Sequence, residues 1–373
     1  YAAQARIAAE LAEPRARVAC IGPAGEKLVP LANIINDGFL SVGGAGIGAV
    51  MGSKNLKAIA VSGNHSVTVV DGNRFVQVVT TLINKLNSSP LTSQSMTSWG
   101  SAFFVDLCYQ KGILPLKNFQ GSAFGESRID LIETLSNTFT LRSRGCFACP
   151  IACIKKTDVK NPLFKGKGMA PTYLAIGALG HNCGITDLTT IGMANMICAE
   201  MGLDPLAAGG TIATAMELEE KGIVSEDTLK LELKFGQGKD LLQALTLIAT
   251  KKGHARRIGQ GSKAMAEEYG NPQLFMGVKS IPMAPFDPRA IQGMGLHFAT
   301  SNYGPHHLYA YTFIEEILNV HSQMDPWTIQ GKPELVKRYQ DTAAVMDSLG
   351  LCNWPLMGLK LNNFVPMVNS CLG

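Results

Sequence analysis

The sequence predicts an α+β fold, with a β-rich end-piece followed by two mainly α-helical domains. Residues 17–62 combine short apolar runs with glycine turns, a pattern typical of strands. From about residue 70 onward, apolar residues recur at helical spacing between capping residues. A proline-rich segment, residues 277–293, predicts the connection between the two helical domains.

The β-rich part contains two clear strand candidates. "RVACIGPAG", from residue 17, predicts a short apolar strand that runs into a turn. "LKAIAVSG", from residue 56, predicts a second strand that ends at Gly63. Between them lies a glycine-rich stretch, residues 43–52, which we call the glycine loop.

The helical part is predicted from apolar spacing and from caps. Four stretches have this pattern: residues 74–89, 187–202, 204–222 and 238–253. Asp187 predicts an N-cap, and the helix after it should end at Gly202. Pro205 predicts the start of the next helix, with Gly222 just beyond its end. The last stretch should carry lysines in its final turn.

Composition excludes several classes of protein. The chain has 373 residues, of which 46% are hydrophobic and 17% charged, which suits a large enzyme of two or three domains. A net charge of +4 is too small to indicate a nucleic-acid-binding protein. No apolar run reaches the roughly 18 residues that a membrane helix needs. Because the chain begins at Tyr1, we expect it to be an internal piece of a longer protein.

The cysteines predict a metal or redox site. Nine cysteines in a long, Met-rich chain do not resemble a disulfide framework, and a reducing, oxygen-poor cytoplasm suits them best. Cys146, Cys149 and Cys153 are spaced C-x₂-C-x₃-C. A zinc knuckle, or simply buried cysteines, is one interpretation, but zinc usually recruits a second close pair and the sequence has none. Three clustered cysteines plus a distant one are typical of an iron–sulfur cubane.

The fourth ligand has to come from elsewhere in the chain. The candidates are Cys20, Cys108, Cys183, Cys198, Cys352 and Cys371. Local context favours Cys352, because Gly350 can turn the backbone just before it.

Other motifs are weaker when each is taken alone. The helix after the glycine loop is short and no acidic residue follows the next strand, so a dinucleotide site is rejected, while a loop that approaches an anionic cofactor stays plausible. "MGLD" (201–204) and "LGLC" (349–352) match ordinary glycine C-caps.

His306 and His307 follow a Gly-Pro turn. Adjacent histidines are more often surface or core residues than catalysts, yet an imidazole near a redox cofactor suits proton transfer.

In combination, these motifs resemble the aldehyde ferredoxin oxidoreductase family of tungsten, sometimes molybdenum, pterin enzymes. The matching stretches lie in order along nearly the whole chain: "IGPAGEKLVP" (21–30), "GGAGIGAVMGSKNLKAIAV" (43–61), "CFACPIAC" (146–153), "GLD" (202–204), "ATSN" followed by the histidines, and "DSLGLC" (347–352). The resemblance implies that Cys146, Cys149, Cys153 and Cys352 ligate one [4Fe–4S] cluster.

The resemblance also implies a domain plan and cofactor contacts. Residues 1–65 would be the tail of a β-rich, pterin-binding domain whose larger part is missing, residues 66–280 a helical second domain, and residues 281–373 a truncated helical third domain. The expected contacts to the bis-pterin metal cofactor are Gly43, Gly44, Ala45, Gly46, Asp204, Asp347, Gly350 and Leu351. His307 would handle protons, with His306 as the adjacent contender. The expected partners are a small-molecule substrate, a ferredoxin or ferredoxin-like subunit, and a second copy of the chain in a homodimer.

Three departures from the family pattern bear on the substrate. Ala199 stands where the first pterin motif has its leading aspartate, and an arginine that family members have near Gly44 is missing. Thr172 and Leu174 replace two glutamates, one of which lies beside the metal in aldehyde-oxidising members. The alternatives are therefore a relative that reduces an aromatic thioester or a carboxylate, and an iron–sulfur electron-relay protein that has lost its pterin.

Overall fold

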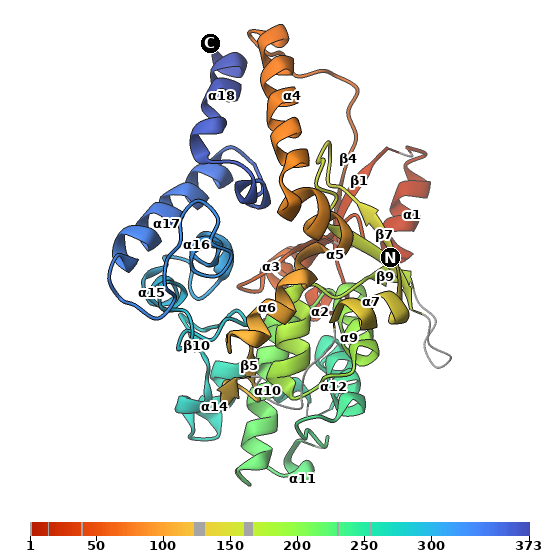
Figure 1. The fold of residues 1–373 in the computed structure, drawn as a ribbon. Coiled ribbons are helices and arrows are strands. Elements are labelled where there is room, and N and C mark those ends of the chain that lie inside the picture. The colour runs from red at the N-terminus through yellow and green to blue at the C-terminus, as the bar shows by residue number, and fades with distance from the viewer. Residues whose placement is uncertain are drawn as a thin grey trace.

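The computed structural model describes residues 2–13, 15–38, 40–122, 131–159, 167–229, 231–253 and 255–373. It combines sheet and helix, which confirms the predicted α+β class (Figure 1). Among these residues, none of the helices has the length and apolar character needed to cross a lipid bilayer.

The N-terminal part is built on an antiparallel sheet of order β3-β2-β1-β4. Its strands are β1 (Arg17–Ile21), β2 (Ile34–Asn36), β3 (Leu40–Val42) and β4 (Ala58–Val61). Both predicted strands are thus confirmed, and they pair with each other, Cys20 lying opposite Ala58. The helices of this part are α1 (Ala2–Glu10), α2 (Pro23–Glu26) and α3 (Ile47–Ser53). The glycine loop leads into α3, which is as short as the sequence predicts.

The helical part begins with α4 (Gly72–Ser88), which Asp71 caps through the backbone N–H of Arg74. Two predicted caps are confirmed in α9 (Leu188–Met201), where Asp187 accepts from the first turn and Gly202 adopts a left-handed conformation at the end. α10 (Pro205–Glu220) is buried along most of its length and packs against α14 (Ser262–Glu268). α12 (Gly238–Thr250) packs on α9, and its lysines lie just beyond the last turn, not within it.

Short elements connect these helices. They are η1 (Leu91–Ser95), α5 (Met96–Trp99), η2 (Gly100–Phe103), α6 (Phe104–Gln110), β5 (Pro115–Leu116), β6 (Gly121–Ser122), α7 (Leu131–Thr138), α8 (Tyr173–Ala175), η3 (Ile176–Gly180), η4 (His181–Cys183), α11 (Glu226–Leu229), α13 (Ala255–Ile258), η5 (Pro272–Leu274), β10 (Gly277–Val278) and β11 (Ile281–Pro282).

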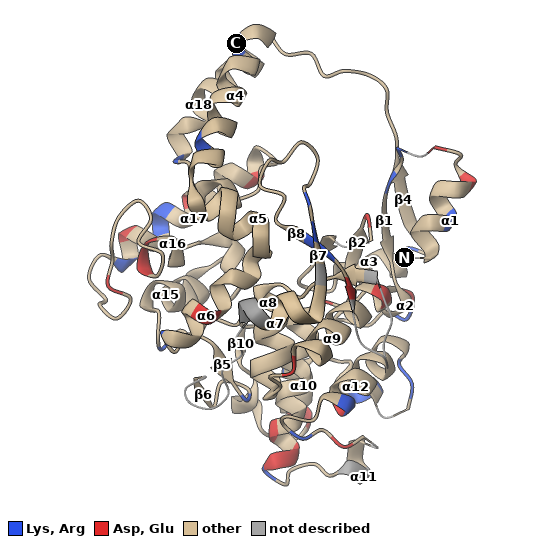
Figure 2. Cartoon of the chain, turned by 45° about the vertical axis from the view of Figure 1, so that its right-hand side comes forward, with Lys and Arg blue, Asp and Glu red and all other residues tan. Residues whose placement is uncertain are grey.

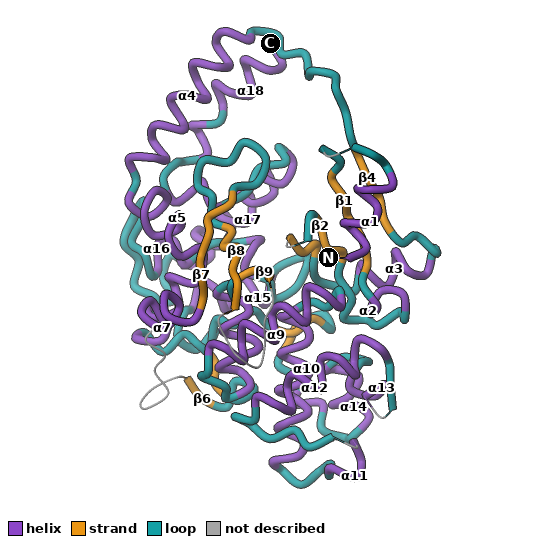
Figure 3. Tube along the Cα trace, turned by 90° about the vertical axis from the view of Figure 1, so that its right-hand side faces the viewer, coloured by secondary structure: helices purple, strands orange, loops and turns teal. Residues whose placement is uncertain are grey.

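A second antiparallel sheet stands apart from the first. Its order is β7-β8-β9, formed by β7 (Phe139–Arg144), β8 (Ile154–Val159) and β9 (Lys167–Met169). β7 and β8 form a hairpin whose connection, residues 145–153, carries the three clustered cysteines (Figure 3). We call this connection the cysteine loop.

The C-terminal part contains α15 (Gln292–Thr300), η6 (His307–Tyr309), α16 (Phe313–Glu316), α17 (Lys332–Ser348), η7 (Trp354–Met357), η8 (Leu361–Asn363) and α18 (Val365–Leu372). α18 lies beside α4, and the backbone N–H of Asp71 donates to the carbonyl of Ser370 at 2.9 Å (Figures 1 and 3). The end of the chain therefore packs on the start of the second predicted domain. The boundaries near residues 65 and 280 stay predictions.

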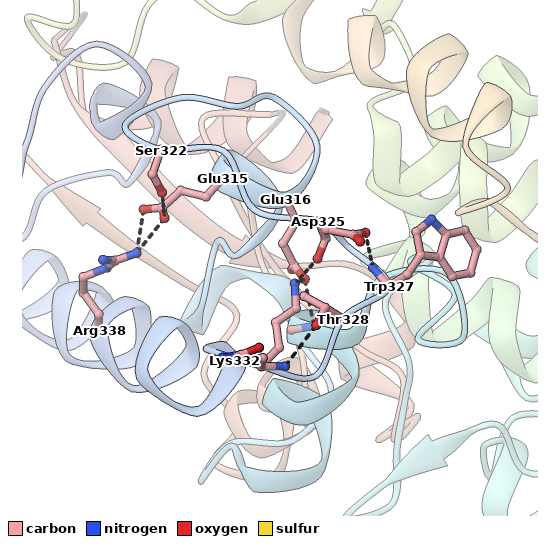
Figure 4. Close-up of polar contacts among 10 residues, drawn as sticks. Glu315, Glu316, Ser322, Asp325, Trp327, Thr328, Lys332 and Arg338 are labelled. Atoms are coloured by element: carbon pink, nitrogen blue, oxygen red, sulfur yellow. Dashed lines mark hydrogen bonds and ion pairs between the residues drawn. The ribbon is translucent and has the colours of Figure 1, made fainter.

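Two buried carboxylates tie α16 to α17. Glu316 pairs with Lys332, both side chains being almost fully buried, and it also accepts from the backbone N–H of Gly293 at 2.9 Å (Figure 4). Glu315 accepts from Arg338, with one guanidinium nitrogen 2.7 Å from each of its oxygens. These pairs fix α17 against α16.

Candidate cofactor-binding site

The glycine loop bends sharply at three consecutive residues. Gly44, Ala45 and Gly46 all have positive φ, at 85°, 53° and 71°. The two glycines adopt this region without penalty, and they also lack room for a side chain: a Cβ on Gly46 would lie 2.4 Å from the carbonyl oxygen of Pro30. The loop therefore offers main-chain atoms, and not side chains, to a neighbouring group.

Asp204 joins the glycine loop to α10. Its Oδ2 accepts from the backbone N–H of Gly44 at 2.8 Å, and its Oδ1 accepts from the N–H groups of Leu206 and Ala207 at 2.8 and 3.4 Å. Burial raises the pKa of this carboxyl, and the three N–H donors oppose that shift. Two predicted contact residues, Gly44 and Asp204, thus lie together and hold each other.

Tyr303 and Asn33 complete this corner, and neither was predicted from the sequence. The hydroxyl of Tyr303 donates to the carbonyl of Gly43 at 3.3 Å, and a Cβ on Gly44 would lie 2.0 Å from it. Asn33 is buried beside Gly43, and its Oδ1 has no partner within the described part of the chain. Tyr303 lies in the stretch that carries the histidines, which is the signal that could have identified it. Asn33 has no such signal.

A row of aromatic side chains leads from the glycine loop toward Cys352. In order, its members are Tyr303, His306, His307, Tyr311 and Trp354. Their successive ring centroids lie 6.2, 4.9, 5.8 and 5.5 Å apart. The row ends where the backbone N–H of Trp354 donates to the Cys352 sulfur at 3.4 Å. We call this the aromatic row.

His307 sits inside the row. Its side chain is buried, and its Nδ1 has no partner among the residues described. Burial, followed by the nearby His306 and His297, holds the pKa of His307 well below 6.5. The imidazole is therefore neutral at pH 7 and offers one uncommitted buried nitrogen.

The cysteine loop is held in a defined shape. Ala148 and Ala152 both have positive φ, at 53° and 49°, and the backbone N–H of Cys149 donates to the carbonyl of Cys146 at 3.1 Å. Buried Lys155 donates from its Nζ to the carbonyl of Thr97, to Ser143 Oγ at 2.7 Å and to the carbonyl of Ala152 at 3.2 Å. The loop is thereby fastened to the end of α5 and to its own strands.

The four predicted cluster cysteines share one electrostatic neighbourhood. Burial raises the pKa of Cys153 to about 12, with further contributions from Cys352, Cys149 and Cys146. Burial also raises the pKa of Cys352 to about 11, with contributions from Cys149 and Cys146, although by surface area Cys352 and Cys146 are exposed. Thiols that influence one another in this way lie close together, across about 200 residues of sequence.

Within the described ranges, no set of three or more His, Cys, Asp or Glu side chains is placed to hold a single metal ion. A four-iron cluster fills the space between its ligands, whereas a single zinc ion draws its sulfurs to about 2.3 Å from one centre. Among the described residues, Cys146, Cys149, Cys153 and Cys352 are therefore not placed to hold one metal ion. Their role as cluster ligands stays a prediction.

The turn after α17 carries the remaining predicted contacts. Gly350 has φ 66°, so it turns the backbone before Leu351 and Cys352 as its sequence predicts. Asp347 is exposed in the last turn of α17 and contributes to raising the pKa of Tyr309 and Tyr311. None of the contacts described here joins Asp347, Gly350 or Leu351 directly to the glycine loop; the aromatic row connects the two regions.

The departures from the family pattern have structural roles. Thr172 caps α8, accepting from the backbone N–H of Ala175 at 3.4 Å, and Leu174 packs partly buried against the core. Ala199 lines a cavity of about 310 Å³ between α9, α1 and β1. None of the three supplies an ionisable group.

Comparisons with known proteins identify the family of this chain. Residues 1–63 match the family model "Aldehyde ferredoxin oxidoreductase, N-terminal domain", and residues 77–373 match "Aldehyde ferredoxin oxidoreductase, domains 2 & 3". The chain is 38% identical to the tungsten-containing aldehyde ferredoxin oxidoreductase of Pyrococcus furiosus and 39% identical to that of Thermococcus kodakarensis. In both cases 99% of this chain is covered, and it spans 61% of the length of the relative.

A solved structure shares the fold. It is the active-site complex BamBC of benzoyl coenzyme A reductase with 1,5-dienoyl-CoA, which superimposes with a TM-score of 0.79 at 20% identity over 99% of this chain and 63% of that one. The family models together account for nearly all of the sequence. This chain therefore belongs to the aldehyde ferredoxin oxidoreductase family.

Proposed function

We propose that this chain is part of a tungsten- or molybdenum-pterin enzyme that oxidises an aldehyde to a carboxylic acid and passes the electrons through a [4Fe–4S] cluster to a ferredoxin. The aromatic row carries this proposal, because it links the glycine loop to Cys352 across some 300 residues of sequence. The glycine loop, the two histidines and Cys352 are weak signals when each is taken alone. In the structure they lie along this one row of contacts.

The residues on this path fit the cofactors. Cys146, Cys149, Cys153 and Cys352 would hold the cluster as thiolates. The side-chain-free backbone at Gly43 and Gly44, together with the uncommitted Asn33 Oδ1, suits a flat, polar pterin. Such a cofactor supplies two-electron redox chemistry when bound, and the cluster supplies one-electron transfer.

The reaction balances with water as the oxygen source. The aldehyde gains one oxygen atom from water and releases two protons and two electrons, which reduce two ferredoxin molecules by one electron each. Because His307 is neutral and its buried Nδ1 is free, this atom can accept one of the protons. Burial around it excludes bulk water from that step.

A second candidate is a relative that acts on an aromatic thioester or a carboxylate. Thr172 and Leu174 favour it, since both positions lack the carboxylate that the resemblance places beside the metal. A third is an electron-relay protein without pterin, which the substitution at Ala199 favours.

Metal analysis of the anaerobically purified full-length protein separates these functions. Tungsten or molybdenum with about four irons per chain supports a pterin enzyme, iron alone supports the relay, and zinc alone contradicts both. Oxidation of aldehydes with a viologen dye as acceptor then distinguishes the first candidate from the second. Cys352→Ser should lower the iron content, whereas Cys371→Ser on α18 should leave it unchanged. Equal iron in both variants contradicts the assignment of Cys352.

A further inference from the structure

The β7–β8 hairpin concentrates positive charge beside the cysteine loop. From Phe139 to Thr157 the sequence contains four basic residues and no acidic one. One of them, Lys155, is buried, and its Nζ donates a hydrogen bond to Ser143 Oγ. The other three are Arg142, Arg144 and Lys156, and Figure 2 shows basic residues in blue along this hairpin.

Strand register places these three cations on one face. Arg142 lies directly opposite Lys156, and Arg144 follows two residues after Arg142, so that all three side chains leave the same side of the hairpin. The other side carries buried Phe139, Lys155 and Thr157, and on the cationic side Ile154, opposite Arg144, is also buried. Because like charges directly opposite each other destabilise an antiparallel pair, the facing of Arg142 and Lys156 is unfavourable for the hairpin itself. Among the described residues of β7 and β8, the carboxylate on the cationic face is that of Asp158, which lies farther along β8, away from the cysteine loop.

The cationic face continues into the cysteine loop. Arg144 forms a backbone bridge with Cys153 and stands two residues before Cys146 in the sequence. Phe147, between the first two cysteines, is 95% exposed. An aromatic residue and arginines are the side chains that protein interfaces favour, and a fully exposed phenylalanine gains from being covered.

We propose that Arg142, Arg144, Phe147 and Lys156 form the docking patch for a small, carboxylate-rich electron-transfer protein. This inference rests on the proposed function and specifies where its ferredoxin binds. Opposite charges steer such a partner to the patch, and Phe147 packs against it at the centre. Interfaces of this kind are small, about 1,200 Å² or less, and transient. Each docking event reduces the partner by one electron, so two events follow the oxidation of one substrate molecule.

Direct binding tests the patch independently of turnover. The probe is a purified acidic [4Fe–4S] ferredoxin, immobilised for biolayer interferometry, with the full-length anaerobic holoenzyme in solution. The unmodified protein should bind at low ionic strength and more weakly at about 0.15 M salt, where the Debye length is about 8 Å. No binding, or binding that does not respond to salt, would overturn the proposal.

Variants then locate the surface. Arg142→Glu combined with Lys156→Glu should raise the Kd by about tenfold or more, and Phe147→Ala by about fivefold. Lys239→Glu, an exposed lysine on α12, is the matched control and should leave the Kd unchanged. Iron content is compared for every variant, and if the double variant loses iron, Arg142→Gln replaces it. Patch variants that bind as tightly as the control refute the proposal.

The proposed function and the docking inference can be refuted independently of each other. If the unmodified protein binds the ferredoxin through this patch but does not oxidise aldehydes with a dye, the docking inference stands and the aldehyde activity is refuted.

Discussion

Replacing Asp204 with alanine tests the contact that joins the glycine loop to α10. The change removes the N-cap of α10, which costs about 1 kcal/mol. It also leaves the buried N–H of Gly44 without its acceptor, which costs about 1–3 kcal/mol. Because burial raises the pKa of this carboxyl, relief of desolvation offsets part of the loss. We therefore expect the free energy of unfolding to fall by about 2–3 kcal/mol at pH 7.

Asp187→Ala is the matched control, since the hydrogen bonds described for Asp187 all come from Thr189 and Thr190 in the first turn of α9. It should cost only about 1 kcal/mol in urea unfolding. Native-state hydrogen exchange gives the sharper measurement: the Gly44 amide should lose protection in Asp204→Ala and keep it in Asp187→Ala. Equal costs for the two variants, or a Gly44 amide that stays protected without Asp204, would refute the reasoning.

Three further predictions concern the C-terminal part. Lys332→Met should destabilise the protein by about 3–5 kcal/mol, because it removes the cation that pairs with the buried Glu316 carboxyl, and adding Glu316→Leu should restore most of this in thermal unfolding. His306 has its pKa lowered by burial to about 4, and burial also lowers the pKa of His297. The unfolded chain therefore binds more protons below about pH 6.5, so stability should decrease as the pH falls from about 6.5 to 4; a flat urea-midpoint profile would contradict this. His307→Ala should reduce turnover by about 10²–10⁴-fold with unchanged metal content, and near-normal turnover would exclude it as the proton acceptor.

Local signals account for the part of the fold that was predicted correctly. Asp187, Gly202 and Pro205 set helix ends through contacts within a few residues, so the sequence is sufficient to place them. The bond between Gly44 and Asp204 spans 160 positions, and nothing in either local pattern indicates it. A chain-wide motif match suggested that these residues share a site, but it could not show that they contact each other.

For the cysteine loop, the sequence indicated the residues but not the structure that carries them. Its cysteine spacing favours an iron–sulfur cluster, which stays a prediction. The β7–β8 hairpin that carries the loop was not predicted, because its outward face is cationic and polar. The place of Tyr303 against Gly44 depends on packing between parts of the chain that are 259 positions apart. Such contacts are decided by the assembled core.

The three hydrogen bonds of Lys155 have a consequence for how the cysteine loop is ordered. They hold the cysteine loop through oxygens of α5, β7 and the loop itself, none of which is a thiol. Ordering of the loop is therefore a property of the polypeptide, unlike in zinc fingers, where metal binding supplies the folding free energy. Under the proposed function, the thiols of this loop would meet incoming iron in an already ordered loop, so the affinity for a cluster would not be diminished by the entropy of ordering a flexible segment.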